Sequence, residues 1–428
     1  MVILRGMLGL AFFCLAAWAL SSHRRRVPWR IVVFGLALQG VLAWLILGTN
    51  GGQQVFAQLS EMVQKLISMS EPGTALVFGP LAKREVMAEV VGEENAFIFA
   101  FAGSGLAAII FFSALMAVLY HLGVMQLLVY GLARVMTAVL GVSGAESMAV
   151  AANVFVGQTE APLVVRPYIE GMTRSELNAM MTGGFATIAG SVLAVYIGVL
   201  GDEYGSHLLA ASVMSAPAAF LVAKIMLPET EGSATGGRVE LQFKKSASNI
   251  VEAAANGTSD GLKLWLNVIA MLIAFTGLVA LIDWPLGAIG ESRLAESLPV
   301  LEGLSLQKIF GWVFAPVSWL MGVDGWHDCQ LFGSLLGTKI SINEFVAFTQ
   351  LQAILPGSEG GFEHTRSAQM AAYALCGFAN FASIGIQIGG ISPLAPGRKT
   401  ELAKLAPRAM LGGAMASWMT AVMAGMFL

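Results

Sequence analysis

The sequence predicts an all-α integral membrane protein with eight transmembrane helices and two re-entrant hairpins, and three observations lead to this prediction. The chain of 428 residues is 56% hydrophobic and 12% charged, with a mean hydropathy of +0.73, whereas soluble domains carry about 25% charged residues. Uncharged stretches recur at about the 17 to 25 residues that a membrane-spanning helix needs. Two further apolar regions are interrupted by carboxylates. The eight spans are expected at 3–20, 31–47, 97–120, 177–200, 208–226, 264–283, 368–395 and 409–428.

The distribution of charge predicts the orientation of these spans. The first span could be a secretory signal peptide, but the arginine-rich loop 21–30 follows it directly, which is a stop-transfer pattern. Short cytoplasmic loops are enriched in Lys and Arg. Loop 21–30, with four arginines, is therefore placed in the cytoplasm. By alternation from it, the basic loops 227–263 and 396–408 also fall on the cytoplasmic side, and the acidic loops 201–207 and 284–307 fall outside. Both termini are therefore expected outside.

Two apolar regions, 140–170 and 305–356, hold a carboxylate near their middle, Glu160 in the first and Glu344 in the second. If either region crossed the membrane completely, the alternation of basic and acidic loops would fail. We therefore expect two re-entrant hairpins, the first entering from the cytoplasm and the second from outside. An ionisable group at this depth costs about 2.5 to 3.5 kcal/mol on insertion scales, which favours a functional role over a structural capping role.

The chain also contains an internal repeat. The segment TRSELNAMMTGGFATIAGS (173–191) follows the first hairpin, and TRSAQMAAYALCGFANFAS (365–383) follows the second. Each unit consists of a hairpin, a broken span and a span, and the two units enter from opposite faces, which makes an inverted-topology repeat. In transporters, such repeats place the substrate near the midplane, where broken helices expose backbone groups. The expected breaks are GGFATIAGS and GFANFAS.

These features divide the chain into four parts. An amphipathic helix over 55–69 is expected to lie in the membrane interface, and the polar stretch 228–262 separates the two halves. The expected parts are N-terminal scaffold spans with the interfacial helix (1–140), the first transport repeat (141–227), a cytoplasmic linker with a scaffold span (228–304) and the second transport repeat (305–428).

The polar residues of the two hairpins indicate the kind of ligand. Two carboxylates, an amide and hydroxyls occur there without a basic side chain in the same motifs, which suits a neutral ligand rich in hydrogen-bond donors. The three cysteines indicate neither a disulfide framework nor a metal site. His327, Asp328 and Cys329 are adjacent, whereas a nucleophile, its base and an orienting group must meet in space. We therefore expect no enzyme, and the absence of a basic patch argues against nucleic acid as a partner.

The motifs AANVFVGQTEAPL, GGFATIAGS, NEFVAF and CGFANFASIGIQIGG resemble those of the concentrative nucleoside transporters, over roughly residues 95–425. The resemblance implies a homotrimer in which each protomer has a scaffold part and a transport part that moves like an elevator. It also implies import of nucleosides, with uridine and related nucleosides expected, across the lipid bilayer of a bacterial inner membrane. Sodium is the expected coupling ion. Proton coupling is the alternative, and the retained Asn153 and Thr187 argue against it.

The resemblance also assigns site residues. Those expected around the nucleobase are Gln158, Thr159, Glu160, Val192 and Leu266. Those expected around the ribose are Glu344, Asn380 and Ser383, with Phe378 as an aromatic wall. The sodium ion would bind the side chains of Asn153 and Thr187 and the main-chain carbonyls of Val156, Thr187 and Ile188. A cage of mostly neutral oxygens suits a hard cation such as sodium. Without the resemblance, Val192 and Leu266 would be read as ordinary core residues.

Overall fold

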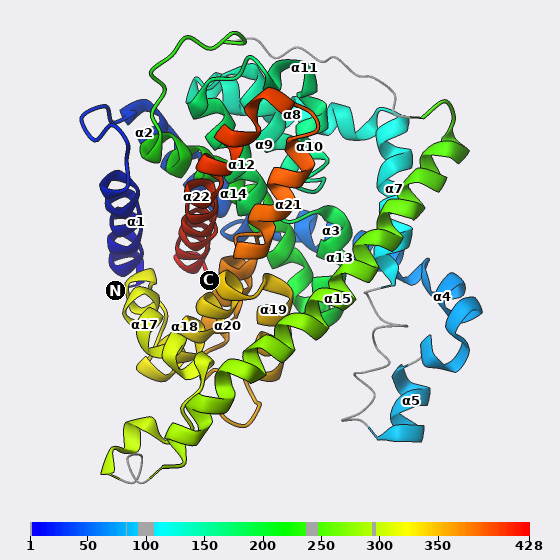
Figure 1. The fold of residues 1–428 in the computed structure, drawn as a ribbon, viewed down its shortest axis with the longest axis vertical. Helices are drawn as coiled ribbons and strands as arrows, with labels where there is room; N and C mark the ends of the chain where they lie inside the picture. The colour runs from blue at the N-terminus through cyan, green and yellow to red at the C-terminus, as the bar shows by residue number, and fades with distance from the viewer. Residues whose placement is uncertain (1, 83, 93–106, 237–246, 293–296) are drawn as a thin grey trace.

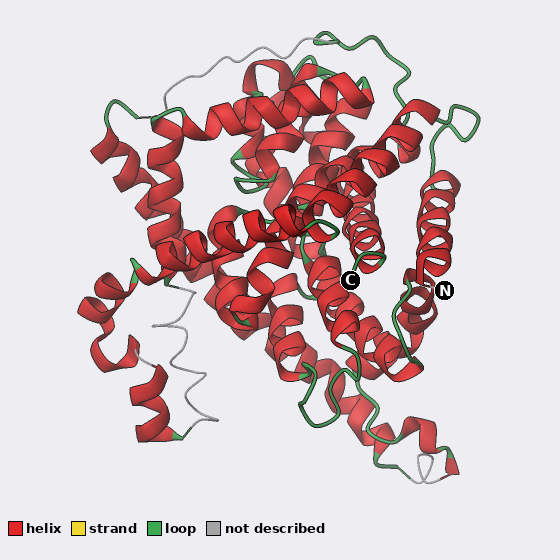
Figure 2. Ribbon diagram, turned by 180° about the vertical axis from the view of Figure 1, so that it is seen from behind, coloured by secondary structure: helices red, strands yellow, loops and turns green. Residues whose placement is uncertain are grey.

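The computed structural model describes residues 2–428 except 83, 93–106, 237–246 and 293–296. Every regular element in this described part is a helix, so the predicted all-α class is confirmed (Figure 2). The hairpin of the first repeat and the hairpin of the second repeat lie toward opposite ends of the bundle (Figure 1). This arrangement agrees with the inverted topology that the repeat predicts.

Five described helical segments are long and apolar enough to cross a membrane, and two bent helix pairs would raise that number to seven. The five coincide with the spans predicted at 3–20, 31–47, 177–200, 208–226 and 264–283. They are α1 (Val2–Ala19), α2 (Trp29–Leu47), the pair α12–α13, α14 (Gly205–Met226) with the turn before it, and α15 (Ile250–Gly290). The predicted span 97–120 lies partly outside the described residues, and its described part falls in α7 (Ala108–His121).

The first repeat begins with a hairpin whose arms are α9 (Gly144–Asn153) and the short helices α10 (Ala161–Val164) and α11 (Arg166–Ile169). It continues with α12 (Arg174–Ala186) and α13 (Gly190–Leu200), which form one span interrupted at the predicted break. Capping boxes begin both α9 and α12, because the side chains at N-cap and N3 satisfy each other's backbone N–H groups. The pairs are Ser143 with Glu146 and Thr173 with Glu176.

The second repeat has the same order of elements. Its hairpin consists of α18 (Trp326–Ser341) and α19 (Glu344–Ala353), its broken span of α20 (Thr365–Leu375) and α21 (Phe381–Ile391), and its last span of α22 (Lys399–Gly425). The predicted hairpin 305–356 also included α17 (Leu306–Met321), which turns into α18 through a bend of 112° and packs closely against it. Gly322 and Gly325 have φ angles of 98° and 66°, which glycine adopts without strain. Residues 322–325 form this bend, and α18 and α19 are the two helices on either side of the tip at Asn343 and Glu344.

Helices α7 and α15 pack along each other at one side of the bundle (Figure 1). Gly257 and Gly261, four residues apart on α15, meet α7 so closely that a Cβ would lie 2.5 Å from the Ser113 oxygen and 2.8 Å from the Ile110 Cα. Such small-residue spacing lets membrane helices approach closely. Helix α15 has 41 residues, or about 60 Å at 1.5 Å per residue, which is about twice the hydrocarbon thickness of a bilayer.

The remaining helices lie between these parts. Helix α3 (Asn50–Ser68) confirms the helix predicted over 55–69, and α4 (Glu71–Phe78) and α5 (Arg84–Val91) follow it. Helix α8 (Val124–Leu140), which bends from α7 by 76°, was not predicted.

Two predicted loops are partly helical. The prediction of a loop at 396–408 is wrong from Lys399 onward, because α22 begins there. The prediction of a linker at 228–262 is wrong from Ile250 onward, because α15 begins there. In both cases a helix continues beyond its apolar part. Hydropathy marks the part of a helix suited to the hydrocarbon core, and charged residues such as Lys and Glu are good helix formers outside it.

Candidate functional site

The tip of the first hairpin is a short polar segment between α9 and α10. Gln158 is buried, Thr159 is half-buried and Glu160 is exposed. The Glu160 carboxylate folds over Gly157, where an added Cβ would collide with it. Gly157 thus permits the conformation of the tip, and the tip presents one accessible carboxylate.

The tip of the second hairpin centres on Glu344, the first residue of α19, after the helix cap Asn343. Glu344 is only 7% exposed. One of its carboxylate oxygens accepts the Tyr196 hydroxyl at 2.9 Å, and the other accepts the Asn380 side-chain N–H at 2.9 Å. Asn380 also caps α21, because its oxygen accepts the Ser383 N–H at 2.8 Å. The three predicted ribose-binding residues are therefore joined in one hydrogen-bonded group.

The breaks of the two broken spans meet at Gly377. A Cβ on this residue would lie 2.8 Å from the Phe185 carbonyl oxygen and 3.0 Å from the Ala186 carbonyl carbon, at the end of α12. Its φ of 150° is also one that other residues rarely adopt. Only glycine lets the two breaks come this close.

Each hairpin packs against the broken span of the other repeat. In the first hairpin, Thr159 lies against α21, where a Cβ on Gly390 would be 2.7 Å from the Thr159 methyl carbon. In the second hairpin, Phe348 stacks on Tyr196 of α13, with ring centroids 4.4 Å apart. The two hairpin tips therefore lie beside the two breaks, in the polar part of the bundle.

The residues expected to hold sodium lie where the first tip meets the first break. The Thr187 hydroxyl lies 2.9 Å from the carbonyl oxygens of both Asn153 and Gly183. The side-chain oxygen of Asn153 is buried and has no hydrogen-bond partner. No hydrogen bond from any other described residue reaches the carbonyls of Val156, Thr187 or Ile188. Unpaired buried acceptors are uncommon, and this oxygen-only set fits a sodium ion.

The other predicted residues divide into two groups. Val192 is 7% exposed near the start of α13, and Phe378 is half-buried in the second break, where it packs against the main core. Leu266 is 51% exposed on α15 and does not join the side chains that pack on that core. The structure therefore buries Val192, half-buries Phe378 and leaves Leu266 on an exposed face.

Three residues of this region were missed from sequence. Tyr196 orients Glu344, as described above. Gln387 of α21 donates its side-chain N–H to the Met181 carbonyl at 2.9 Å. Lys339 is fully buried and donates to the Ala374 carbonyl and the Ser417 hydroxyl, both at 2.8 Å, next to the second break. A lone lysine or glutamine inside an apolar run was the available signal for two of them.

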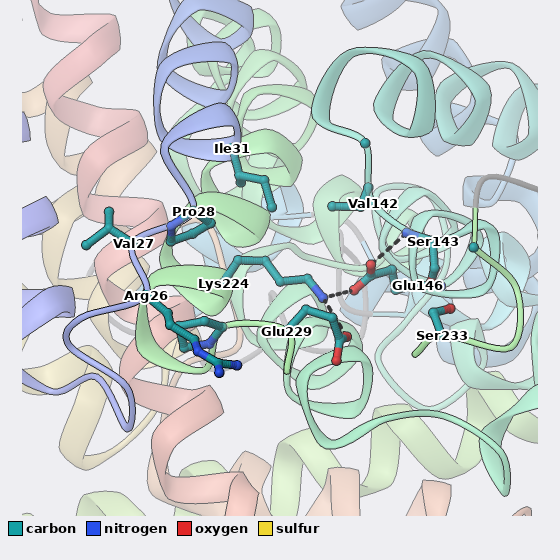
Figure 3. A pocket seen from close by; sticks show the side chains of 13 residues that line it. Arg26, Val27, Pro28, Ile31, Val142, Ser143, Glu146, Lys224, Glu229 and Ser233 are labelled. Carbon is teal, nitrogen blue, oxygen red and sulfur yellow. Dashed lines mark hydrogen bonds and ion pairs between the residues drawn. The ribbon is translucent and has the colours of Figure 1, made fainter. Parts of the chain in front are cut away.

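A separate cavity of about 350 Å³ lies between the start of α9, the end of α14 and the loop before α2 (Figure 3). Its wall holds the buried Lys224, whose ammonium group lies 2.7 Å from Glu146 and 3.6 Å from Glu229 and donates to the Ser175 hydroxyl at 3.0 Å. None of the predicted site residues lines it. This ion-pair cluster joins α9, α12 and α14 near the base of the first hairpin.

The fold and the site define a membrane transporter rather than an enzyme, because two inverted hairpin units enclose a polar region within a bundle of apolar helices. Comparison with known families agrees. Residues 8–81 and 207–425 match the N-terminal and C-terminal regions of the Na+ dependent nucleoside transporters, and residues 106–203 match the Gate family, described as nucleoside recognition.

Individual relatives cover the chain almost completely. The "Uncharacterized transporter YutK" of Bacillus subtilis is 41% identical to this chain, and the match covers 100% of this chain and 100% of the relative. The "Sodium/nucleoside cotransporter 1" of Mus musculus is 39% identical over 97% of this chain and 62% of its own. Among solved structures, CNTnw in an inward-facing substrate-bound state has a TM-score of 0.89 at 40% identity, over 100% of this chain and 98% of its own. A double variant of CNTnw in an outward-facing state has a TM-score of 0.91 at 39% identity, over 100% and 99%.

The chain belongs to the concentrative nucleoside transporter family.

Proposed function

We propose that the protein imports nucleosides by symport with sodium through an elevator-type alternating-access movement. The observation that supports this most strongly is the set of unpaired oxygens at Asn153, Val156, Thr187 and Ile188, directly beside the polar tip of the first hairpin. A cation bound there would connect the tip to the first break. It would thereby order the wall that begins at Gln158, so that sodium binding favours nucleoside binding.

The polar groups suit a neutral substrate rich in hydroxyl and N–H donors. Glu344, held by Tyr196 and Asn380, offers carboxylate lone pairs to ribose hydroxyls, and Ser383 lies one helical turn from Asn380. The buried Lys339 donates to neutral oxygens and does not pair with Glu344. An anionic substrate would therefore meet the carboxylates of Glu160 and Glu344, neither of which has a salt-bridged basic side chain among the described residues.

The membrane potential supplies the driving force for accumulation. One sodium charge moving inward gains about 2.3 kcal/mol per 100 mV, and its concentration gradient adds to this. Sodium coupling is therefore sufficient to concentrate a neutral nucleoside about fifty-fold per 100 mV.

The proposed location is a bacterial inner membrane, with both termini outside and three protomers in the assembly. Three hydrogen bonds gather the expected cytoplasmic segments on one face. Ser22 donates to the Met226 carbonyl, Gly144 to that of Thr235, and Arg398 to that of Met172. This grouping agrees with the orientation that the basic loops predict.

The test is uptake of radiolabelled nucleosides into proteoliposomes that contain the purified protein. Uptake of uridine and of purine nucleosides is measured under an inward sodium gradient and under a matched choline gradient at equal pH. We expect accumulation only with sodium. Glu344→Gln should abolish it, whereas the matched change Glu359→Gln, at an exposed loop residue, should not.

The other outcomes would each reject part of the proposal. Equal uptake in sodium and choline, with accumulation under a pH gradient, would replace sodium by protons. Release of a chemically altered nucleoside would contradict a transporter. If no nucleoside enters under either gradient, the proposed substrate class is wrong.

A further inference from the structure

Gln387 places a second carboxamide next to the tip of the first hairpin. Its side-chain nitrogen lies against Gly184, and the Gln158 side chain lies against the same glycine. A Cβ added to Gly184 would be 3.1 Å from the Cβ of Gln158. Both glutamines are buried, at 1% exposure for Gln387 and 7% for Gln158. Glycine at position 184 leaves the space in which these two side chains approach each other.

The side-chain oxygens of both glutamines are buried and have no hydrogen-bond partner. The orientation of the Gln387 amide follows from its contact with Met181, because only the nitrogen can donate to that carbonyl. Its oxygen therefore faces away from Met181. A buried acceptor without a donor costs about 1 to 3 kcal/mol, so a ligand that supplies N–H groups here would be stabilised.

The position of Gln387 on α21 aligns it with the expected nucleoside. Ser383, Gln387 and Gly390 follow one another at spacings of four and three residues, so they share one face of the helix. Ser383 lies at the expected ribose end, and Gly390 touches Thr159 at the expected base end. Gln387 lies between them, toward the base.

We propose that Gln387 and Gln158 together bind the edge of the nucleobase and favour a base with two adjacent N–H donors. Among the common nucleosides, guanosine presents such an edge, through N1–H and its 2-amino group. Inosine has the same ring and ribose but lacks the second donor. This inference rests on the proposed transport of nucleosides and adds a specificity-determining residue to it.

The rival roles for Gln387 are packing and sodium binding. A packing residue would affect all nucleosides equally. Sodium binding is a rival role because the Asn153 side-chain oxygen lies at the same glycine, 3.5 Å from a Cβ added to Gly184. Loss of a sodium ligand would change the sodium concentration that gives half-maximal uptake. A base-binding residue changes the preference among bases and leaves the sodium response unchanged.

The experiment measures sodium-driven uptake of guanosine and inosine by wild-type protein and by Gln387→Met, which keeps the length of the side chain and removes its amide. We expect wild type to prefer guanosine over inosine by about tenfold, the effect of one well-formed hydrogen bond. In Gln387→Met the preference for guanosine over inosine should fall to about one. Gln54→Met, at an exposed position, is the matched control.

Three results would overturn the inference. They are a wild-type protein without preference for guanosine, an equal loss for both nucleosides in Gln387→Met, and a shifted sodium half-saturation. If Gln387→Met does not fold, Gln387→Leu takes its place, and competition of 1-methylguanosine against guanosine tests the wild type directly. Loss of the N1–H donor should weaken competition about tenfold, and equal competition would refute the inference. Absence of any nucleoside uptake in wild type would instead reject the proposed function, and the inference with it.

Discussion

Tyr196→Phe tests whether the second hairpin binds substrate through an oriented carboxylate. The substitution removes the hydroxyl that donates to Glu344 at 2.9 Å. It keeps the ring that stacks on Phe348 with centroids 4.4 Å apart, in a fully buried position. The expected effect therefore falls on the orientation of Glu344 and not on packing.

The magnitude follows from the remaining contacts of Glu344. A hydrogen bond to a charged group contributes about 1.5 to 3 kcal/mol. Because Asn380 still holds the other carboxylate oxygen at 2.9 Å, the lower value of about 1.5 kcal/mol applies. We therefore expect kcat/KM for nucleoside uptake to fall about tenfold. The sodium half-saturation should stay unchanged, because the unpaired oxygens proposed to bind sodium belong to the first repeat.

The assay is the concentration dependence of initial uptake in proteoliposomes, at saturating sodium and across a sodium titration. Tyr168→Phe is the matched control, because the Tyr168 hydroxyl is buried but has no hydrogen-bond partner. It should leave kcat/KM unchanged. If Tyr196→Phe behaves like this control, or binds nucleoside more tightly, the orienting role of Tyr196 is wrong.

Three further predictions concern the first repeat, the breaks and the ion-pair cluster. Asn153→Ala and Thr187→Ala should lower sodium affinity and nucleoside uptake together in a sodium titration; reduced uptake with a normal sodium response would mean that the ion binds elsewhere. Gly377→Ala should destabilise the protein by about 2 kcal/mol, because its φ is strained for alanine, and an unchanged melting temperature in detergent would contradict this. Lys224→Met leaves Glu146 buried without its partner and should cost about 3 to 5 kcal/mol of stability, measured by thermal melting, while the properly folded fraction keeps its KM; an altered KM would assign the cluster a direct role in transport.

The breaks and the hairpin tips were predictable because their signals are local. Glycine and polar residues in GGFATIAGS and GFANFAS interrupt otherwise apolar helices, and the structure breaks both spans there, after Ala186 and after Leu375. The carboxylates Glu160 and Glu344 stood out for the same reason. An ionisable residue in an apolar segment is a functional candidate, and its position along the chain is visible without the fold.

The rest depends on contacts between distant segments. Tyr196 meets Glu344 across 148 residues of sequence, and Gln387 meets Met181 across 206. A glutamine inside an apolar run is visible in the sequence, but its distant partner is not, and nothing local marks a tyrosine such as Tyr196. The start of the second hairpin was also hidden, because α17 and α18 form one nearly continuous apolar stretch, and only the bend after Met321 separates them.

The reciprocal packing of hairpins and broken spans has a consequence for biosynthesis. The first hairpin emerges from the ribosome early, but α21, which covers its tip, ends at Ile391 and is therefore among the last helices to be made. Until then Gln158 and Glu160 of the first tip have no wall opposite them. A newly inserted N-terminal half therefore cannot form a closed binding compartment by itself.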